Sequence, residues 1–333
     1  MNVALVGCGR ISPKHVAAIE AHPDLELLTA CDIESSPRDK YINQTTSNNL
    51  WNDYGSMLRA VREIDIVSIC TPSDLHAEMA IKAARAGKHV LIEKPIALSG
   101  VEAKRVIQAC KENNVKLCVV VQNRFNPELQ AMKSAVDDFG KILIASAICR
   151  WHRPDEYYHN EWMESQARSG GVAIHQAIHH IDALLWLAGD IAWVSATMRK
   201  QCHDIDAYDT CIATLGFANG AVGTFEATTC AYPRNVESSI TLICEKGTMK
   251  VGGVRMDRRE YLLNDEVIEW AGGYAPTMYD VYGTKHIAQY VEFVNAIKED
   301  RDPLTSGEAA MKAMNVANRM LFSHKLSGAV VEI

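Results

Sequence analysis

Several features that would mark whole classes of protein are missing from the sequence. Its 34 lysines and arginines are outnumbered by 41 aspartates and glutamates, which gives a net charge of −7, so there is no basic surplus to neutralise nucleic-acid phosphates. No apolar run approaches the roughly 18 residues that a membrane-spanning helix needs. The amino terminus has neither the basic start nor the cleavage site of a signal peptide. We therefore expect a cytoplasmic protein with no nucleic-acid or membrane partner.

Closely spaced cysteine pairs are also missing. Ten cysteines are present, but no two are separated by two residues, the spacing of many metal and redox sites. Six of them lie inside apolar, strand-like runs, namely Cys31, Cys70, Cys118, Cys149, Cys211 and Cys244. We expect reduced thiols that pack as small apolar side chains, and no metal site.

The first third of the chain alternates short apolar runs with helical patterns. Strands are predicted over Val3–Val6, Leu25–Cys31, Ile64–Cys70, His89–Ile92 and Lys116–Val121, with a weaker one near Asn48–Trp51. Helices are predicted over Pro13–Ala21, Asp74–Ala86 and Ser99–Asn113. This alternation is typical of a doubly wound parallel sheet with right-handed crossovers, an α/β Rossmann-type domain that we expect to span residues 1–122.

After residue 122 the pattern changes, and we expect a second, α+β domain over residues 123–333. Helices are predicted over Pro127–Asp138, Gly171–Leu187, Lys285–Lys298 and Ser306–Leu326, the last packing back on the first domain. Strands are predicted over Ile142–Arg150, Ala192–Arg199, Tyr208–Phe217, Ala221–Thr229, Ser238–Cys244 and Thr248–Val251. Because short turns join the later strands, they are expected to form an antiparallel meander.

The first predicted strand runs into a dinucleotide-binding pattern, Gly7-Cys8-Gly9-Arg10-Ile11-Ser12, with Ser12 in place of the third glycine. Gly7 permits the tight turn, and Gly9 lets a pyrophosphate approach the backbone. Ser12 is predicted to cap the following helix, with Pro13 at its first position. Asp32 ends the second strand, where a carboxylate binds ribose hydroxyls and repels a 2′-phosphate. The pattern therefore favours NAD over NADP.

Two later strands end in loops that carry candidate site residues. The run Thr71-Pro72-Ser73-Asp74-Leu75-His76 follows one, and Glu93-Lys94-Pro95 follows the next. Ligands of such sheets bind beyond the carboxyl ends of the strands. A lysine after a strand is most often a solvated charge, but beside a cationic nicotinamide the pKa of Lys94 would fall, which suits it to proton transfer.

These motifs together resemble the Gfo/Idh/MocA oxidoreductase family over essentially the whole chain. The resemblance implies a Rossmann domain followed by an open, mainly antiparallel sheet, a catalytic or substrate-orienting Lys94, and often a cis bond before Pro95. It also implies a homo-oligomer, a dimer or tetramer. The residues expected to bind NAD are Gly7, Gly9, Arg10, Ile11, Asp32, Thr71, Pro72, His76, Glu93, Lys94 and Gln122.

A histidine-rich segment, residues 170–182, carries the second set of candidates. On an ideal helix His175, His179 and Asp182 fall within an arc of about 60°, while His180 points away and is expected to be structural. Packed histidines, a metal site and a catalytic base are all compatible with this pattern, although the zinc-protease motif needs Glu where Gln176 stands. The resemblance supports His179 as the base; His175 replaces the acidic or amide residue that is usual there.

Within the family, the chain resembles the WlbA-like and WbpB-like sugar-nucleotide dehydrogenases, which oxidise C3 of UDP-N-acetylglucosaminuronate. Shared features are Gln122–Pro127, Tyr157-Tyr158 with Trp162, His175-Gln176, Ala231–Arg234, Glu245–Thr248, and Gly283 with His286. The residues expected to bind substrate are Lys94, Arg124, Asn126, Trp162, Arg168, His175, Gln176, His179, Arg234 and His286.

The loop Met163-Glu164-Ser165, after Trp162, departs from the Arg-Gly-Thr that is usual in this subgroup. Either the substrate is a neutral UDP-hexosamine, or Arg124, Arg168 or Arg234 binds the carboxylate. Arg124 and Arg234 could equally be salt-bridge partners, and the aromatic residues could be core.

The sequence thus predicts an NAD-dependent dehydrogenase of surface-polysaccharide sugar synthesis, which oxidises a hydroxyl, at C3, of a UDP-N-acetylhexosamine or its uronate. Another sugar or polyol dehydrogenase, such as an inositol dehydrogenase, and an NAD-dependent glycosidase on the same scaffold are the alternatives. A non-enzymatic redox sensor would need neither Lys94 nor His179.

Overall fold

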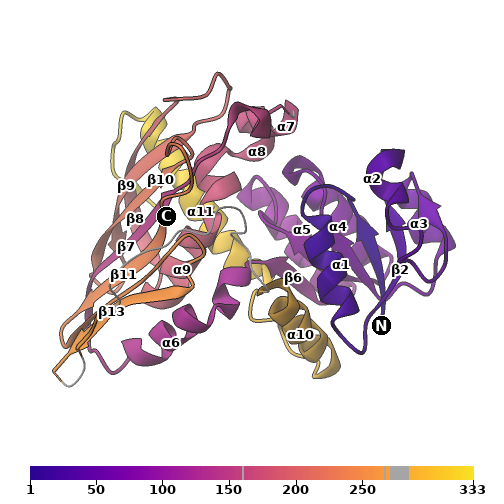
Figure 1. Ribbon diagram of the computed structural model, residues 1–333, viewed down its shortest axis with the longest axis horizontal. Coiled ribbons are helices and arrows are strands. Elements are labelled where there is room, and N and C mark those ends of the chain that lie inside the picture. The colour runs from indigo at the N-terminus through magenta and orange to yellow at the C-terminus, as the bar shows by residue number, and fades with distance from the viewer. Residues whose placement is uncertain (160, 266–267, 271–284) are drawn as a thin grey trace. The chain divides into compact units, whose positions relative to one another are not determined.

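The computed structural model describes residues 1–159, 161–265, 268–270 and 285–333, and it divides the chain into two compact units (Figure 1). The first unit comprises Met1–Val121 together with Thr284–Met311, and the second comprises Gln122–Gly283 together with Lys312–Ile333. Gly283 itself lies outside the described residues. Among the described helices, none is long and apolar enough to cross a membrane.

A six-stranded, all-parallel sheet forms the centre of the first unit, in the order β3-β2-β1-β4-β5-β6. Its strands are β1 (Asn2–Val6), β2 (Glu26–Cys31), β3 (Leu50–Trp51), β4 (Ile66–Ile69), β5 (His89–Glu93) and β6 (Leu117–Val120). The order reverses beside β1, which makes the gap between the ends of β1 and β4 the place where such folds bind nucleotides. The predicted doubly wound sheet is confirmed, including its weak strand β3.

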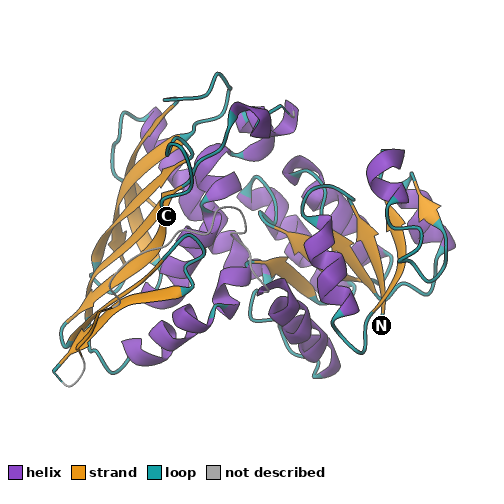
Figure 2. Cartoon of the chain, in the orientation of Figure 1, coloured by secondary structure: helices purple, strands orange, loops and turns teal. Residues whose placement is uncertain are grey.

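Helices cover both faces of this sheet (Figure 2). They are α1 (Ser12–Glu20), α2 (Ser35–Asp39), α3 (Tyr54–Ala60), α4 (His76–Arg85), α5 (Gly100–Glu112), α10 (Lys285–Lys298) and the first residues of α11 (Gly307–Lys325). The sequence analysis missed the short α2 and α3. Helix α10, which is remote in sequence, packs on α1, and its Tyr290 and Phe293 are fully buried among residues such as Leu5 and Val16.

The second unit is built on a nine-stranded mixed sheet, in the order β14-β13-β12-β11-β7-β10-β9-β8-β15. Its strands are β7 (Ile142–Arg150), β8 (Ile191–Arg199), β9 (Thr210–Phe217), β10 (Val222–Thr228), β11 (Glu237–Cys244), β12 (Gly247–Gly252), β13 (Arg258–Asn264), β14 (Ile268–Trp270) and β15 (Val331–Glu332). The predicted simple meander is wrong at one point. Strand β7 lies between β10 and β11 and is parallel to β10, because the segment after β10 crosses the end of β7 instead of forming a tight turn.

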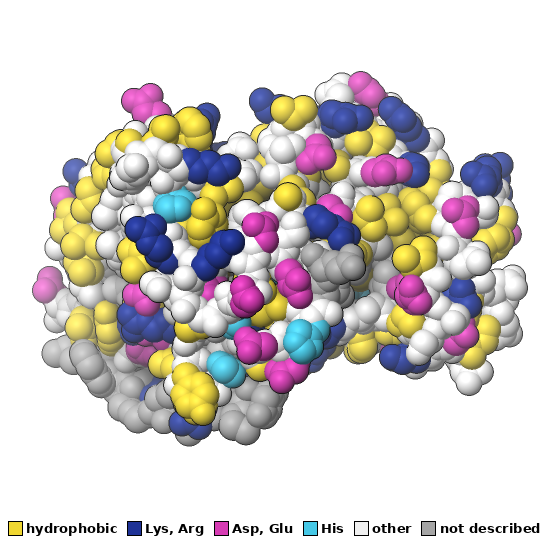
Figure 3. Space-filling view, turned by 90° about the horizontal axis from the view of Figure 1, so that it is seen from above, with side chains coloured by type: hydrophobic (Ala, Val, Ile, Leu, Met, Phe, Trp, Pro, Cys, Tyr) yellow, Lys and Arg dark blue, Asp and Glu magenta, His cyan; other side chains and the backbone are white. Residues whose placement is uncertain are grey.

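One face of this second sheet is covered by helices, and no helix of the described residues covers the other, which we call the bare face (Figure 2). The covering helices include α6 (Pro127–Val136), α9 (Ile178–Ala188) and the end of α11, while the short α7 (Glu161–Glu164) and α8 (Gln166–Ser169) lie near one end of the sheet. Ile144 and Val222 are exposed partners in the parallel register of β7 and β10, and Ile212 on β9 is also exposed. On the face of the molecule that Figure 3 shows, acidic and basic side chains are interspersed.

Replacing Phe293 by alanine tests whether α10 is part of the core of the first unit. Phe293 is 0% exposed, so Phe293→Ala should lower the free energy of unfolding by about 3–5 kcal/mol, measured by urea denaturation. Val291 on the same helix is 41% exposed, and Val291→Ala should change the free energy by about 0.5 kcal/mol or less. Equal effects of the two substitutions would contradict this packing.

Candidate active site

The phosphate turn of the first unit depends on two glycines with different roles. Gly7 has a φ of +89°, and a Cβ there would lie 2.7 Å from the carbonyl group of Cys70, so only glycine fits. A Cβ on Gly9 would meet nothing within 4 Å. Gly9 therefore borders open space, as the predicted approach of a pyrophosphate requires.

Helix α1 begins without a side-chain cap, and the prediction that Ser12 caps it is wrong. Ile11 occupies the N-cap position, and Ser12 is the first helical residue, with proline in the first turn. The Ser12 hydroxyl donates to the Gly9 carbonyl at 2.7 Å and contacts the Tyr41 hydroxyl at 2.7 Å, so it braces the loop instead. A helix N-terminus with no side-chain cap is suited to bind an anion.

Asp32 is fixed directly beside this turn. Its carboxylate accepts the backbone N–H of Cys8 at 2.7 Å and that of Glu34 at 2.9 Å. The expected carboxylate thus lies at the end of β2 against the glycine loop, where a ribose contact is predicted. Of the other residues expected to bind NAD here, Arg10 is exposed and Ile11 is partly exposed in the same loop.

His76 joins the two loops at the carboxyl ends of β4 and β5. Its Nδ1 lies 2.6 Å from the carbonyl oxygen of Pro95, and its Nε2 lies 2.9 Å from that of Thr71. Burial lowers the pKa of His76, and the two carbonyl groups oppose this shift. The Lys94–Pro95 bond is cis, as the resemblance implied. His76, placed by the sequence analysis among the NAD-binding residues, therefore braces the Thr71-Pro72 loop against the loop that carries Lys94.

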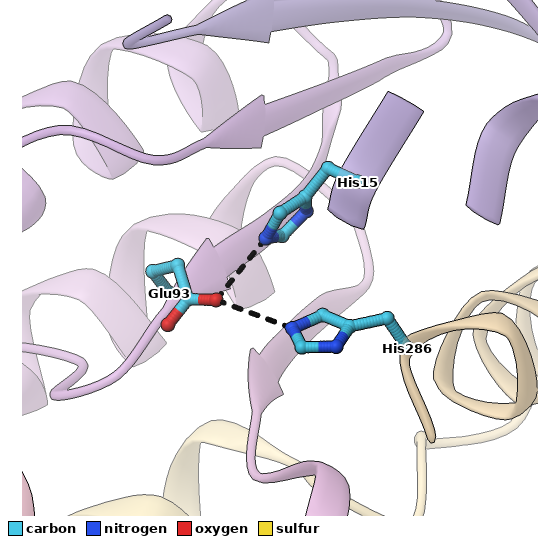
Figure 4. Close-up of side chains that lie close together, drawn as sticks. All are labelled: His15, Glu93 and His286. Atoms are coloured by element: carbon cyan, nitrogen blue, oxygen red, sulfur yellow. Dashed lines mark hydrogen bonds and ion pairs between the residues drawn. The ribbon is translucent and has the colours of Figure 1, made fainter. Parts of the chain in front are cut away.

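Glu93 lies buried between two histidines (Figure 4). Its Oε1 is 3.1 Å from Nε2 of His15 on α1 and 3.7 Å from Nε2 of His286 on α10, while its Oε2 accepts the backbone N–H of Lys94 at 3.1 Å. Burial would raise the pKa of Glu93, but the two imidazoles hold it well below its usual range. The carboxylate is therefore charged, and it fixes the backbone at Lys94.

His15 extends this cluster into a hydroxyl pair. Its Nδ1 lies 3.0 Å from the Tyr290 hydroxyl and 3.1 Å from that of Ser68, and the two hydroxyls are 2.8 Å apart. Burial lowers the pKa of His15, against the opposing effect of Glu93. The spacing of His15, Glu93 and His286 would also suit a metal ion, although hydrogen bonds already account for the carboxylate. The sequence analysis did not single out His15, because its partners lie far away in the chain.

The histidine segment of the second unit is not one continuous helix, contrary to the prediction. Residues 172–176 form a π-helical turn, Ala177 interrupts it, and α9 begins at Ile178. The arc calculated for an ideal helix therefore does not apply. Asp182 instead binds Arg124 through two hydrogen bonds of 2.6 and 2.8 Å, and both side chains are buried. Burial raises the pKa of Asp182, and Arg124 opposes this shift.

His175 belongs to a separate polar and aromatic cluster. The Tyr157 hydroxyl lies 3.1 Å from Nε2 of His175 and accepts a hydrogen bond of 2.8 Å from the Gln176 amide. The Trp162 ring stands edge-on to His175, with 5.0 Å between centroids. The structure thus brings together three residues that the sequence analysis assigned to substrate: Tyr157 links His175 and Gln176, and Trp162 contacts His175 directly.

The remaining predicted residues of the second unit are spread over several places. His179 and Gln122 are buried and line one small cavity together with Arg255. Asn126 caps α6 by accepting the Glu128 N–H, and its amide also donates to the Met256 carbonyl, so its contacts are structural. In addition, Arg168 is half-buried on α8 and Arg234 is exposed in the loop after β10.

The chain matches models of a known family along most of its length. Residues 1–121 match the model of an oxidoreductase family with an NAD-binding Rossmann fold, and residues 129–250 match the GFO/IDH/MocA C-terminal domain. The protein belongs to the Gfo/Idh/MocA family. It is accordingly an NAD-dependent oxidoreductase of the sugar and polyol dehydrogenase type, and the resemblance seen in the sequence is confirmed.

Individual family members show the same likeness. The WlbA dehydrogenase from Bordetella pertussis, crystallised with NADH and UDP-GlcNAcA, superposes with a TM-score of 0.90 at 33% identity, covering 100% of this chain and 98% of that one. Inositol 2-dehydrogenase of Rhizobium meliloti is 26% identical over 96% of this chain and 95% of its own length. The oxidoreductase YrbE of Bacillus subtilis is 27% identical over 67% of this chain, and the match spans 65% of YrbE.

Replacing Gly9 separates cofactor binding from folding. Since a Cβ at Gly9 meets no protein atom within 4 Å, Gly9→Ala should leave the Tm unchanged but weaken NADH binding by about tenfold or more, because the methyl group occupies the space of the pyrophosphate. NADH fluorescence titration measures this. Gly55→Ala, where only the flexible end of Arg59 is close, is the control and should bind NADH normally.

Glu93→Gln tests the charged state of the buried carboxylate. Since the pKa of Glu93 is lowered on folding, its stabilising effect is complete above the unfolded pKa of about 4.5 and is lost as the pH falls below it. The variant should be about 3 kcal/mol less stable than the wild type at pH 7. The difference in Tm between the two proteins should narrow as the pH is lowered. Glu78→Gln, which alters an exposed pair with Lys82, should have almost the same Tm as the wild type at every pH. A difference in Tm between Glu93→Gln and the wild type that does not change with pH would contradict a charged Glu93.

Proposed function

We propose that the protein is an NAD-dependent dehydrogenase that oxidises the C3 hydroxyl of a UDP-N-acetylhexosamine or of its uronate, in the synthesis of surface-polysaccharide sugars in the cytoplasm. The observation that carries the proposal is the full-length likeness to a WlbA dehydrogenase whose crystal structure holds NADH and UDP-GlcNAcA. The cluster of Tyr157, His175, Gln176 and Trp162 supports it, because it offers aromatic surface and hydrogen-bonding groups suited to a sugar.

Two side chains divide the chemistry in this proposal. When bound, NAD⁺ accepts the hydride that leaves C3. His179 removes the proton of the hydroxyl, since histidine is the side chain most often used as a general base near neutral pH. Lys94 donates a hydrogen bond to the same oxygen and stabilises the negative charge that develops there. The Glu93 carboxylate and the His76 brace fix the loop from which Lys94 extends.

The buried pairing of Arg124 bears on the charge of the substrate. The Asp182 carboxylate already neutralises Arg124, so Arg124 is a poor partner for a uronate. Glu164 also stands two residues after Trp162, at the end of α7, where it would repel a second carboxylate. These charges favour a neutral UDP-N-acetylhexosamine, and leave only Arg168 and Arg234 of the three arginines to bind a uronate.

A panel of substrates tests the proposal directly. Purified protein with NAD⁺ is mixed with UDP-N-acetylglucosamine, its uronate, UDP-glucose or myo-inositol, and NADH absorbance is followed. We expect NADH to form with a UDP-N-acetyl sugar and kcat/KM to be higher for the neutral one. Turnover of myo-inositol alone would establish the alternative that the inositol dehydrogenase relative favours. Release of a sugar product without net NADH would indicate a glycosidase.

His179→Ala and Lys94→Ala should each lower kcat by about 100-fold or more, the usual scale for loss of a general base or of an oxyanion donor. Each variant should retain NADH affinity and Tm. Lys82→Ala, which removes an exposed lysine paired with Glu78, is the matched control for charge and should keep full activity. If either active-site variant turns over at the wild-type rate, the proposed role of that residue is wrong.

The bare face of the nine-stranded sheet supports a homo-oligomer, a dimer or tetramer. Ile144, Val222 and Ile212 are 39%, 52% and 56% exposed on adjacent strands, and a second copy of the same face would cover them. Light scattering should report the mass of a dimer or larger, and the mass of a monomer would contradict this part of the proposal.

A further inference from the structure

Two cysteines of the second unit differ from all the others in exposure. All ten cysteines lie in the described residues, and eight of them are buried; Cys202 is exposed and Cys230 is half-buried. Cys202 lies in the segment between β8 and β9, and Cys230 follows the end of β10. Although the two are distant in sequence, the strand pairing of β9 and β10 brings these segments to the same end of the sheet.

Asp209 holds the backbone on the Cys202 side. Its carboxylate accepts the N–H groups of Gln201, Cys202 and His203 at 2.9, 2.9 and 3.1 Å, and also faces Nδ1 of the His203 ring at 3.1 Å. Nε2 of the same ring lies 2.8 Å from the carbonyl oxygen of Arg153. The position of Cys202 is therefore defined by several hydrogen bonds, even though its thiol is exposed.

Cys230 is held on the other side, with its thiol directed toward this segment. Its N–H donates to the Thr228 hydroxyl at 3.1 Å, and its sulfur lies 3.7 Å from the Thr210 hydroxyl. The thiol lies within 4.8 Å of the nearest ligand atoms of His203 and Asp209, and the Asp209 carboxylate is the group that accepts the backbone N–H of Cys202 at 2.9 Å. The two cysteines therefore flank the same carboxylate, Asp209, one through its backbone and the other through its thiol.

We propose that Cys202 and Cys230 are a redox-active thiol pair that closes to a disulfide by exchange with a small-molecule disulfide. The Cys202 thiolate attacks one sulfur of the oxidant RSSR, forms a mixed disulfide and expels RS⁻. The Cys230 thiolate then attacks the Cys202 sulfur and expels the second RS⁻. The two protons that leave the cysteines go to the two released thiolates, so one RSSR is reduced to two RSH for each disulfide formed.

The surroundings set the order of these two steps. Cys202 is the accessible thiol and meets the oxidant first. Burial, with the nearby Cys202 thiol and the Asp209 carboxylate, raises the pKa of Cys230 to about 12, so only a small fraction of Cys230 is thiolate at neutral pH. Closure is therefore the slow step, and its rate should rise with pH up to that pKa.

The alternative use of this cluster is a metal site formed by His203, Asp209 and Cys230, whose ligand atoms have suitable spacing. The thiol pair is favoured because the Asp209 oxygens already accept several N–H groups, which a metal ion would have to displace. The disulfide would also join the segment between β8 and β9 to the segment after β10. Both lie near Tyr158, whose ring centroid is 4.7 Å from that of His203. The inference is independent of the proposed substrate.

Thiol counting on the full-length protein tests the pair. Reduced, native protein should show two thiols that react with Ellman's reagent, and none after treatment with glutathione disulfide. The intact mass should fall by two hydrogens with no glutathione adduct, and dithiothreitol should restore both thiols. A peptide digest under non-reducing conditions should link Cys202 to Cys230, and the oxidised protein should have the higher Tm.

Single variants separate the two steps. Cys230→Ser should stop at a stable glutathione adduct on Cys202, whereas Cys202→Ser should resist glutathione disulfide. The buried Cys244→Ser is the control and should still form the disulfide. In the wild type the adduct should disappear faster at pH 9 than at pH 7. A persistent adduct in the wild type, two thiols that still titrate after oxidation, or thiols that react only after a chelator removes bound metal would each overturn the proposal.

Discussion

One buried carboxylate, Glu93, joins three separate segments of the first unit. Glu93 contacts His15 on the helix of the phosphate turn, His286 on the helix that returns from the far end of the chain, and the backbone of Lys94. A charge in this environment is tolerated only while its partners are present, and loss of one partner of such a pair typically costs about 3–5 kcal/mol. The glycine turn before α1, the loop of Lys94 and helix α10 are therefore interdependent.

In the second unit, the arrangement of the histidine segment depends on an interrupted helix. A continuous helix would have placed His175, His179 and Asp182 on one face. The π-helical turn over residues 172–176 instead sends His175 to Tyr157 and Trp162, while Asp182 stays with Arg124. Irregular turns of this kind inside helices often occur at functional sites. The interruption therefore gives His175 and His179 different surroundings.

Local signals were sufficient for the six strands of the first unit, although not for its short helices α2 and α3. Continuous apolar runs identified its buried parallel strands, and Gly7, Gly9 and Asp32 identified the nucleotide turn, because each depends on residues adjacent in the chain. The strand order of the second sheet was not accessible in this way. The insertion of β7 between β10 and β11 depends on long-range pairing, which short turn signals do not report.

By itself, the sequence determined the family, the parallel NAD-binding sheet and the groups that take part in the proposed chemistry, since these follow from local pattern and motif. Only the tertiary structure decided which side chains meet. His15 and His286 reach Glu93 from positions 271 residues apart (286 − 15), Arg124 pairs with Asp182, and Cys202 and Cys230 both lie at Asp209. The physical reason is that hydrogen bonds, ion pairs and thiol contacts depend on distance in space, whereas a sequence pattern reports only separation along the chain.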